Sequence, residues 1–272
     1  MAINRASISK ELLPGLNAIF GLEYGEVENE HAPLFEIENS DRAFEEEVLF
    51  TGFGNAPVKA EGAAVTYDEA SESYVARYTN ETISLAFAVT EEAMEDNLYD
   101  TFAKLRSKSL ARAMGNTKQV KGADVFNQGF NTAYAGGDGQ PLFSASHPTV
   151  DGTQTNVLSA ADLSFASLEA ALTTIQKIKD DRGILTGGSA ESLHVAPDNW
   201  ATSNSLLNST LIPASGTVSA LGGSQAATNP AGWNDVNSIQ SMSMLPKGVF
   251  INRRFTDADA WFIRTNCEDG TK

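Results

Sequence analysis

The chain has 272 residues, of which 42% are hydrophobic and 20% are charged, so it can bury a core as one large domain or two ordinary ones. Its formal net charge of −16 and pI near 4.5 argue against polyanion binding as the main function, because the long-range field repels phosphate groups. A single cysteine, Cys267, excludes an internal disulfide framework and a cysteine-based zinc site. We therefore expect a globular protein of a reducing cytoplasm.

No targeting or membrane-spanning segment is expected. Residues 1–20 contain only short apolar runs and lack the apolar region of a signal peptide. No run approaches the roughly 18 apolar residues that a transmembrane helix needs. The sequence predicts a protein that is neither exported nor embedded in a membrane.

The N-terminal part of the chain resembles an arm more than a compact domain. Ser9 is a candidate cap for a short helix that Pro14 and Gly15 interrupt, and a second small amphipathic patch follows at 16–22. Residues 23–47 mix acidic residues with isolated apolar ones, which suits an extended segment that lies across another surface. An ordinary surface-packed extension is the alternative.

Residues 48–89 change to a strand-like pattern. Two runs with a period of two, 64–68 and 74–89, predict a long two-stranded excursion. The Pro- and Gly-containing stretch 56–62 predicts a turn with Lys59 near its tip. A hairpin of this length is marginally stable alone, so we expect it to gain support from a neighbour.

The best-defined element is a long amphipathic helix predicted over 90–114. Thr90 is the expected N-cap, acidic residues fill the first turns, and basic residues fill the last turns, which complements the helix dipole. Weaker helical character continues to Phe130. This pattern is typical of any packed surface helix and names no function. The expected apolar stripe consists of Met94, Leu98, Phe102, Leu105, Ser109, Ala113 and Met114.

Residues 133–159 are rich in Gly, Ser, Thr and Pro and predict a connection between subdomains. Ser144, Ser146 and His147 suggest a nucleophile and a base. We reject that reading, because no Gly-x-Ser-x-Gly elbow surrounds either serine. The glycine-rich stretch 136–139 lacks the context of a phosphate-binding loop and predicts a turn.

The C-terminal half predicts a lobe of helices and strands. Asp162 is the expected N-cap of a second helix that Gly183 ends. A strand at 192–196 and a helix that opens near Asp198 follow. Residues 208–234 predict a long loop of low charge, a kind that is usually functional or mobile. The last strands are expected at 239–244, 248–252 and 260–264.

Candidate site residues are few. His31, His147 and His194 are far apart in sequence and form no metal-ligand pair at helical spacing. His194, inside a strand, is expected to be a hydrogen-bonded core residue. Asp257 and Asp259 are expected to be solvated turn acids. We therefore predict no catalytic, cofactor-binding or metal-binding residue.

Three short strings carry a resemblance that spans nearly the whole chain. They are GQPLFSASHP at 139–148, HVAPDNW at 194–200 and AWFIRT at 260–265. Together with the order of arm, hairpin, long helix and lobe, they resemble the major capsid protein of tailed bacteriophages with the Hong Kong ninety-seven fold. The strings are similar to segments of its Mu-like head-subunit branch.

This resemblance implies an α+β fold and a division of the chain into the parts of that capsid protein. Relatives continue with further strands after AWFIRT, whereas this sequence stops at Lys272, so the placement of the C-terminus stays open. The implied parts are an N-terminal arm at 1–47, an extended β-hairpin loop at 48–89, a peripheral domain with its spine helix at 90–159, an axial domain at 160–250 and a return strand toward the peripheral domain at 251–272.

The resemblance also implies a structural protein without enzymatic activity or cofactor. Such subunits assemble through pentamers and hexamers into an icosahedral head shell that encloses double-stranded DNA. The implied partners are other copies, bound by the arm and the extended loop, with scaffold, portal and decoration proteins as further candidates. DNA would be contacted only non-specifically, and membranes not at all. The implied location is the virion capsid, after assembly in the bacterial host cytoplasm.

Three further points stay open. Some relatives crosslink a lysine to an asparagine of the next subunit, and Lys59 is the nearest lysine, although no partner asparagine or catalytic glutamate is identified. One alternative is a shell protein of an encapsulin-like, non-viral nanocompartment. The other is a serine hydrolase that uses Ser146 and His147.

Overall fold

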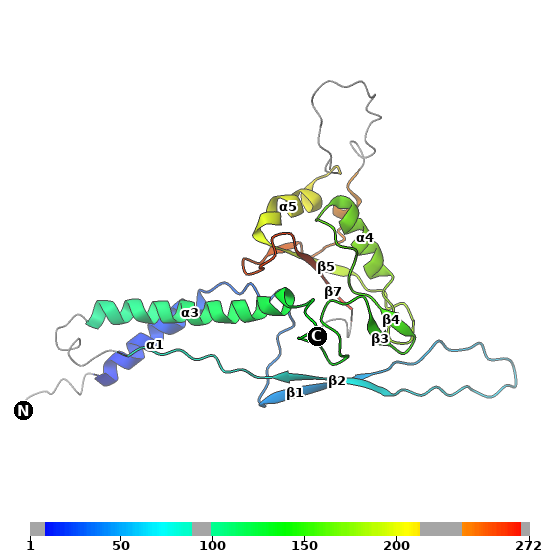
Figure 1. The fold of residues 1–272 in the computed structure, drawn as a ribbon, viewed down its shortest axis with the longest axis horizontal. Coiled ribbons are helices and arrows are strands. Elements are labelled where there is room, and N and C mark those ends of the chain that lie inside the picture. The colour runs from blue at the N-terminus through cyan, green and yellow to red at the C-terminus, as the bar shows by residue number, and fades with distance from the viewer. Residues whose placement is uncertain (1–8, 89–98, 213–235, 268–272) are drawn as a thin grey trace, which may run out of the picture. The chain divides into compact units, whose positions relative to one another are not determined.

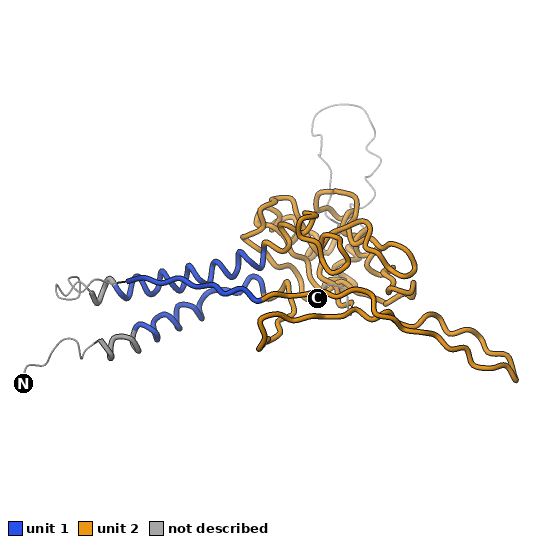
Figure 2. The backbone as a smooth tube through the Cα atoms, turned by 60° about the horizontal axis from the view of Figure 1, so that its bottom comes forward, with its two compact units in different colours: residues 1–31, 80–123 blue, residues 32–79, 124–272 orange. Residues whose placement is uncertain are grey.

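The computed structural model describes residues 9–88, 99–212 and 236–267, which form a mixed fold of helices and strands (Figure 1). The chain divides into two compact units. The first contains residues 1–31 and 80–123, and the second contains residues 32–79 and 124–272 (Figure 2). Helices and strands follow one another along the chain, and three of the four strand pairs in the described residues are antiparallel, which fits the predicted α+β class.

Helix α1 (Ser9–Gly25) belongs to the first unit and runs through Pro14 without a break. The predicted interruption at Pro14 and Gly15 is therefore wrong. A proline inside a helix removes one backbone hydrogen bond and crowds the preceding turn. Tertiary contacts stabilise a helix more than local propensity does, and α1 has such a contact, since the hydroxyl of Ser107 donates a hydrogen bond to the Leu16 carbonyl.

Helix α3 (Tyr99–Asn127) corresponds to the helix predicted over 90–114. Residues 90–98, with the expected N-cap Thr90, lie outside the described residues. The helix continues unbroken to Asn127, as the weaker pattern predicted. Phe130 follows its end in a turn.

The buried face of α3 differs from the predicted apolar stripe. Leu105 is 64% exposed, and Ser109 and Ala113 are exposed as well. A Cβ atom on Gly115 would lie only 2.9 Å from a methyl group of Val27, so small residues on this face permit close packing within the first unit. Side-chain size therefore selects the buried face. Its members recur every four residues: Ala103, Ser107, Ala111, Gly115, Gln119 and Ala123.

In the second unit, strands β1 (Phe44–Phe50) and β2 (Glu72–Thr79) form an antiparallel ribbon. The strand predicted at 64–68 does not form, because these residues lie in the long loop 51–71 that joins the two strands (Figure 1). The true partner, β1, contains three successive glutamates, which hide its strand character in the sequence. Backbone pairing tolerates them, since their side chains remain at least partly exposed.

The lobe of the second unit is built on a three-stranded sheet in the order β6-β5-β7. β5 (Ala190–Val195) pairs parallel with β6 (Val249–Ile251) and antiparallel with β7 (Trp261–Thr265), which confirms three predicted strands. Helix α4 (Phe165–Gln176) contributes the apolar side chains that pack against them. The resulting core consists of Leu163, Leu168, Leu172, Ile175, Ala190, Leu193, Val195, Leu206, Ile239 and Leu245.

The ends of α4 differ from the prediction. Its N-cap is Ser164, whose hydroxyl accepts a hydrogen bond from the Ser167 N–H, while the Ser167 hydroxyl accepts one from the Ser164 N–H. Asp162 is not the cap, because this reciprocal pair already satisfies the N–H groups at the helix start. The helix ends at Gln176, and Gly183, with φ of +79°, lies in the turn that follows.

The strand predicted at 239–244 is wrong, since its first residues belong to the short helix α6 (Ser238–Ser241). The buried side chain of Asn237 accepts hydrogen bonds from the N–H groups of Ile239 and Gln240. An asparagine in this position favours a helix start over a strand. The cap therefore outweighs the alternating apolar pattern.

The remaining elements are short. The 3₁₀ turn η2 (Pro197–Asn199) leads into α5 (Trp200–Asn208), which confirms the helix predicted near Asp198. The predicted connection at 133–159 contains an unexpected hairpin of β3 (His147–Thr149) and β4 (Gly152–Gln154). Most of the long loop predicted at 208–234 lies outside the described residues.

Candidate functional site

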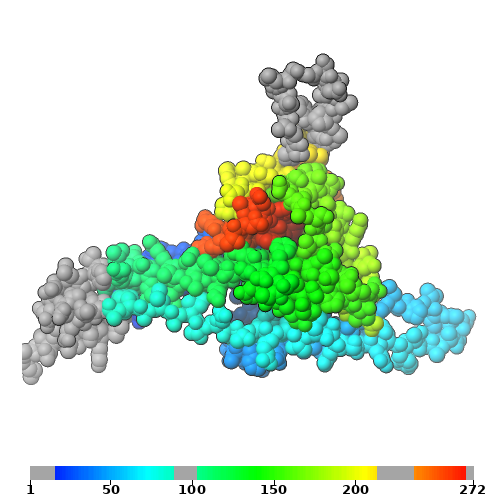
Figure 3. All heavy atoms as spheres, viewed as in Figure 1, coloured from blue at the N-terminus to red at the C-terminus, as the bar shows by residue number. Residues whose placement is uncertain are grey.

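Loop 51–71 carries several large apolar side chains that are exposed to solvent and do not contribute to a core. Val58 is 100% exposed, Tyr67 93%, Val65 66% and Phe53 65%. The loop protrudes from the second unit in the space-filling view (Figure 3). Exposed apolar residues that gather in one segment mark a contact surface on a soluble protein.

The base of this loop is fixed to the lobe by Arg182. Its Nε donates to the carbonyl of Gly52 at 3.0 Å, and its Nη2 donates to the carbonyl of Glu69 at 2.6 Å. The carboxylate of Asp68 accepts the N–H of Gly54 at 2.7 Å and lies 3.6 Å from the guanidinium. The N–H groups of Gly54 and Glu69, and then the charge of Arg182, hold the pKa of Asp68 below its ordinary value.

The β1–β2 ribbon has one open face. The guanidinium of Arg77 lies 4.5 Å from the centre of the Phe44 ring and forms an ion pair with Glu46. Phe44 is 44% exposed and Val75 49% exposed, so this face adds apolar area beside the loop. The opposite face is covered near Gly137, where a Cβ atom would lie 2.9 Å from the Tyr74 ring.

The segment after α1 is anchored rather than free in the second unit. Leu34 is 6% exposed, and the Phe35 ring lies 5.6 Å from that of Phe126 within a cluster of phenylalanines. Arg264 donates to the carbonyl of Pro33 at 3.0 Å. The other rings of this cluster are Phe130, Phe143, Phe255 and Phe262.

In the first unit, polar contacts hold the end of α1 to α3. The carboxylate of Glu23, 7% exposed, accepts from Arg112 Nε at 2.6 Å and lies 3.5 Å from Lys108 Nζ. The hydrogen bond from Arg112 is the main cause that lowers the pKa of Glu23. The buried amide of Gln119 accepts from the N–H of His31 at 3.0 Å.

The rejected catalytic reading receives no geometric support. The Ser146 hydroxyl has the Ser144 hydroxyl as its neighbour, at 3.4 Å, while the ring of His147 pairs with Asp138 through Nδ1 at 2.6 Å. A serine nucleophile needs the base within hydrogen-bond reach of its own oxygen. The role of Asp138 was missed in the sequence, where its only signal is an acid in the turn 136–139 that precedes the histidine.

The other candidate residues are structural. His194 is 1% exposed in β5, its Nε2 lies 2.9 Å from the Ser192 hydroxyl, and its ring stacks on Phe250, which confirms the predicted core role. Burial, and then the charge of Arg264, lower the pKa of His194 to about 4. Asp257 accepts the N–H of Asp259 in a turn. Among the described residues, no group of three or more His, Cys, Asp or Glu is arranged to hold a metal ion.

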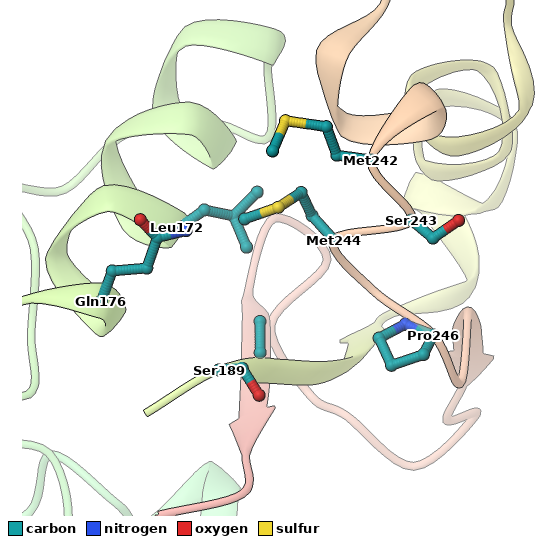
Figure 4. Close-up of a pocket in the computed structure, with 8 residues that line it drawn as sticks. Leu172, Gln176, Ser189, Met242, Ser243, Met244 and Pro246 are labelled. Atoms are coloured by element: carbon teal, nitrogen blue, oxygen red, sulfur yellow. The ribbon is translucent and has the colours of Figure 1, made fainter. Parts of the chain in front are cut away.

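An open hollow of about 240 Å³ lies between α4 and the start of β5. In the close-up, Leu172 and Met244 point toward one another across it (Figure 4). None of its lining side chains titrates, so it offers no acid–base chemistry. The residues that line the hollow are Leu172, Gln176, Ser189, Ala190, Met242, Ser243, Met244 and Pro246.

None of the helices in the described ranges has the length and apolarity to cross a membrane.

The comparison with known families identifies the class of protein. Residues 73–270 match the model of the phage capsid protein family, and the chain belongs to this family. No curated protein and no solved structure gives a significant match. Family membership makes the chain a structural capsid protein of the virion and supports self-association into a shell. Strand β1 and loop 51–71 precede the matched range.

Proposed function

We propose that this chain is the major capsid subunit of a tailed bacteriophage, with the Hong Kong ninety-seven fold of the Mu-like branch. Copies assemble through pentamers and hexamers into the icosahedral head shell that encloses double-stranded DNA. The observation that carries this proposal is loop 51–71, whose apolar side chains are exposed in a protein of a capsid family.

The hydrophobic effect favours binding of this loop to another copy. Removing a large apolar side chain from water contributes about 1.5–3 kcal/mol. Tyr67 and Val58 are almost fully exposed in the single chain and gain this free energy when a neighbour covers them. A loop that binds a different surface of the next copy makes a heterologous contact, and repetition of this contact builds a ring when the rotation between copies closes.

The predicted parts of the subunit follow the same proposal. The arm at 1–47 and the extended loop at 48–89 contact neighbours, 90–159 and 251–272 form the peripheral domain, and 160–250 forms the axial domain around the symmetry axes. The net charge of −16 suits a wall that does not trap packaged DNA. Assembly takes place in the host cytoplasm, with scaffold, portal and decoration proteins as partners, and the subunit has no enzymatic activity.

Electron microscopy of the purified chain, over a range of protein concentrations, tests this proposal. We expect pentamers and hexamers, or closed shells and tubes made from them. Monodisperse single subunits at every concentration would contradict it. Particles purified from cells that carry protein cargo and no DNA would instead support the non-viral nanocompartment.

A further inference from the structure

The neck of loop 51–71 consists of its two end segments, 51–54 and 68–71, through which the loop leaves and rejoins the β1–β2 ribbon. Thr51 and Ser71 join the two segments directly. The Thr51 N–H donates to the Ser71 carbonyl at 2.8 Å, and the Ser71 N–H donates to the Thr51 hydroxyl at 2.8 Å. Farther out, the Gly54 N–H donates to Asp68 at 2.7 Å. These bonds hold the two segments of the neck to each other, but they do not fix the direction of the loop relative to the lobe.

Arg182 supplies that missing connection. Its planar guanidinium contacts both segments of the neck at once. Nε donates to the carbonyl of Gly52 in the first segment, and Nη2 donates to the carbonyl of Glu69 in the second. The carboxylate of Asp68 lies 3.6 Å away and supplies the opposite charge. A rigid fork of donors can satisfy several acceptors in one geometry, which a flexible lysine cannot reproduce.

The turn that carries Arg182 is itself well fixed. The Asp180 carboxylate accepts from the N–H groups of Arg182 and Ile184 at 2.9 and 2.8 Å. Gly183 has a φ of +79°, a conformation that suits glycine. The Asp180 carbonyl accepts from the side chain of Gln154 at 2.8 Å, and this bond ties the turn to β4. Arg182 therefore projects from a rigid base.

Beyond the neck, the loop has little to hold its direction. The short turn in which the Ala63 N–H donates to the Ala60 carbonyl connects only neighbouring residues. Val58 and Tyr67 lie in solvent. The direction in which these apolar side chains point is consequently decided at the neck.

We infer that Arg182 is a latch that sets the angle at which loop 51–71 leaves the lobe, and through that angle the geometry of the contact with the next copy. The latch itself follows from the contacts within one chain, whereas its effect on assembly rests on the proposed function. Because Arg182 is partly solvated, with its side chain 24% exposed, the latch can open without unfolding the lobe.

Hydrogen exchange on the unassembled subunit tests the latch, with Arg182→Ala and Arg182→Lys as variants. We expect the neck amides of 52–54 and 68–71 to exchange several-fold faster in Arg182→Ala, with a smaller increase in Arg182→Lys. The amides of β5 report whether the lobe remains folded. Lys177→Ala is the matched control, because it removes a positive charge from an exposed position of the same segment.

Electron microscopy of the same variants tests the assembly part. We expect Arg182→Ala to form particles of irregular curvature and Lys177→Ala to form those of the unmodified chain. Neck amides that exchange equally in Arg182→Ala and the unmodified chain would overturn the latch. Faster exchange with unchanged particles would overturn the link to assembly geometry. An unmodified chain that never assembles would overturn the proposed function and leave the exchange result standing.

Discussion

At the scale of single residues, His194 shows what a strand pattern can and cannot predict. Its place inside a strand correctly predicts a core residue that forms a hydrogen bond. The neighbours that set its charge come from elsewhere in the chain, since Phe250 stacks on the ring and Arg264 contributes a positive charge. No local sequence pattern contains this information.

The lowered pKa of His194 predicts a pH dependence of stability. The ring binds a proton below about pH 6.5 when the chain is unfolded, but only below about 4 when it is folded. Acid therefore favours the unfolded state, and the stabilisation from a neutral buried ring is complete above pH 6.5 and decreases as the pH falls toward 4. We expect a loss of about 2 kcal/mol between pH 7 and pH 5.

Urea unfolding at pH 7 and pH 5 checks this expectation in the unmodified chain and in His194→Gln. Glutamine keeps a hydrogen-bonding side chain but does not titrate. The variant should be less stable at pH 7 and should lose less stability between the two pH values. Equal losses in both proteins would show that His194 does not carry this pH dependence.

At the scale of elements, the strands of the lobe and the strand β2 were predictable, whereas the strand β1 was not. β6 and β7 are short, mainly apolar runs next to turn residues, and β5 ends shortly before Pro197, so all three are visible in sequence. β1 was hidden by its glutamates, and the buried face of α3 was hidden because most of its residues, such as Ala111 and Gly115, are small and carry little hydrophobic signal. In each failure, a partner distant in sequence decides the structure.

Close packing at Gly115 predicts that adding one methyl group destabilises the first unit. Alanine favours a helix over glycine by about 1 kcal/mol, but its Cβ would lie 2.9 Å from one methyl group of Val27 and 3.0 Å from the other. Overpacking costs about 1–3 kcal/mol. We therefore expect Gly115→Ala to lower the free energy of unfolding by about 1 kcal/mol.

A double-mutant cycle with Val27→Ala isolates this contact. Val27→Ala removes the methyl groups that the new Cβ would meet, so the double variant should be more stable than the sum of the two single effects predicts. Strictly additive effects on the denaturant midpoint would mean that the two residues do not limit each other.

At the scale of the whole molecule, the family was predictable from the sequence without knowledge of any side-chain contact. Short strings such as HVAPDNW, together with the order of elements, resemble phage capsid proteins, and residues 73–270 confirm that class. The contact surfaces were not predictable. Exposed apolar residues such as Tyr67 read as an ordinary strand face in sequence, and only the structure shows that loop 51–71 holds them away from the core.

In the proposed shell, loop 51–71 joins one copy to the next, and charge substitutions at its apolar positions test this contact. Val58→Asp with Tyr67→Asp places two charges on the loop. The matched control, Val150→Asp with Leu185→Asp, changes residues of the same unit that are 56% and 62% exposed outside the loop. Sedimentation and electron microscopy should show folded single subunits for the loop variant and shells for the control. Shells of normal size and yield from the loop variant would contradict the claim.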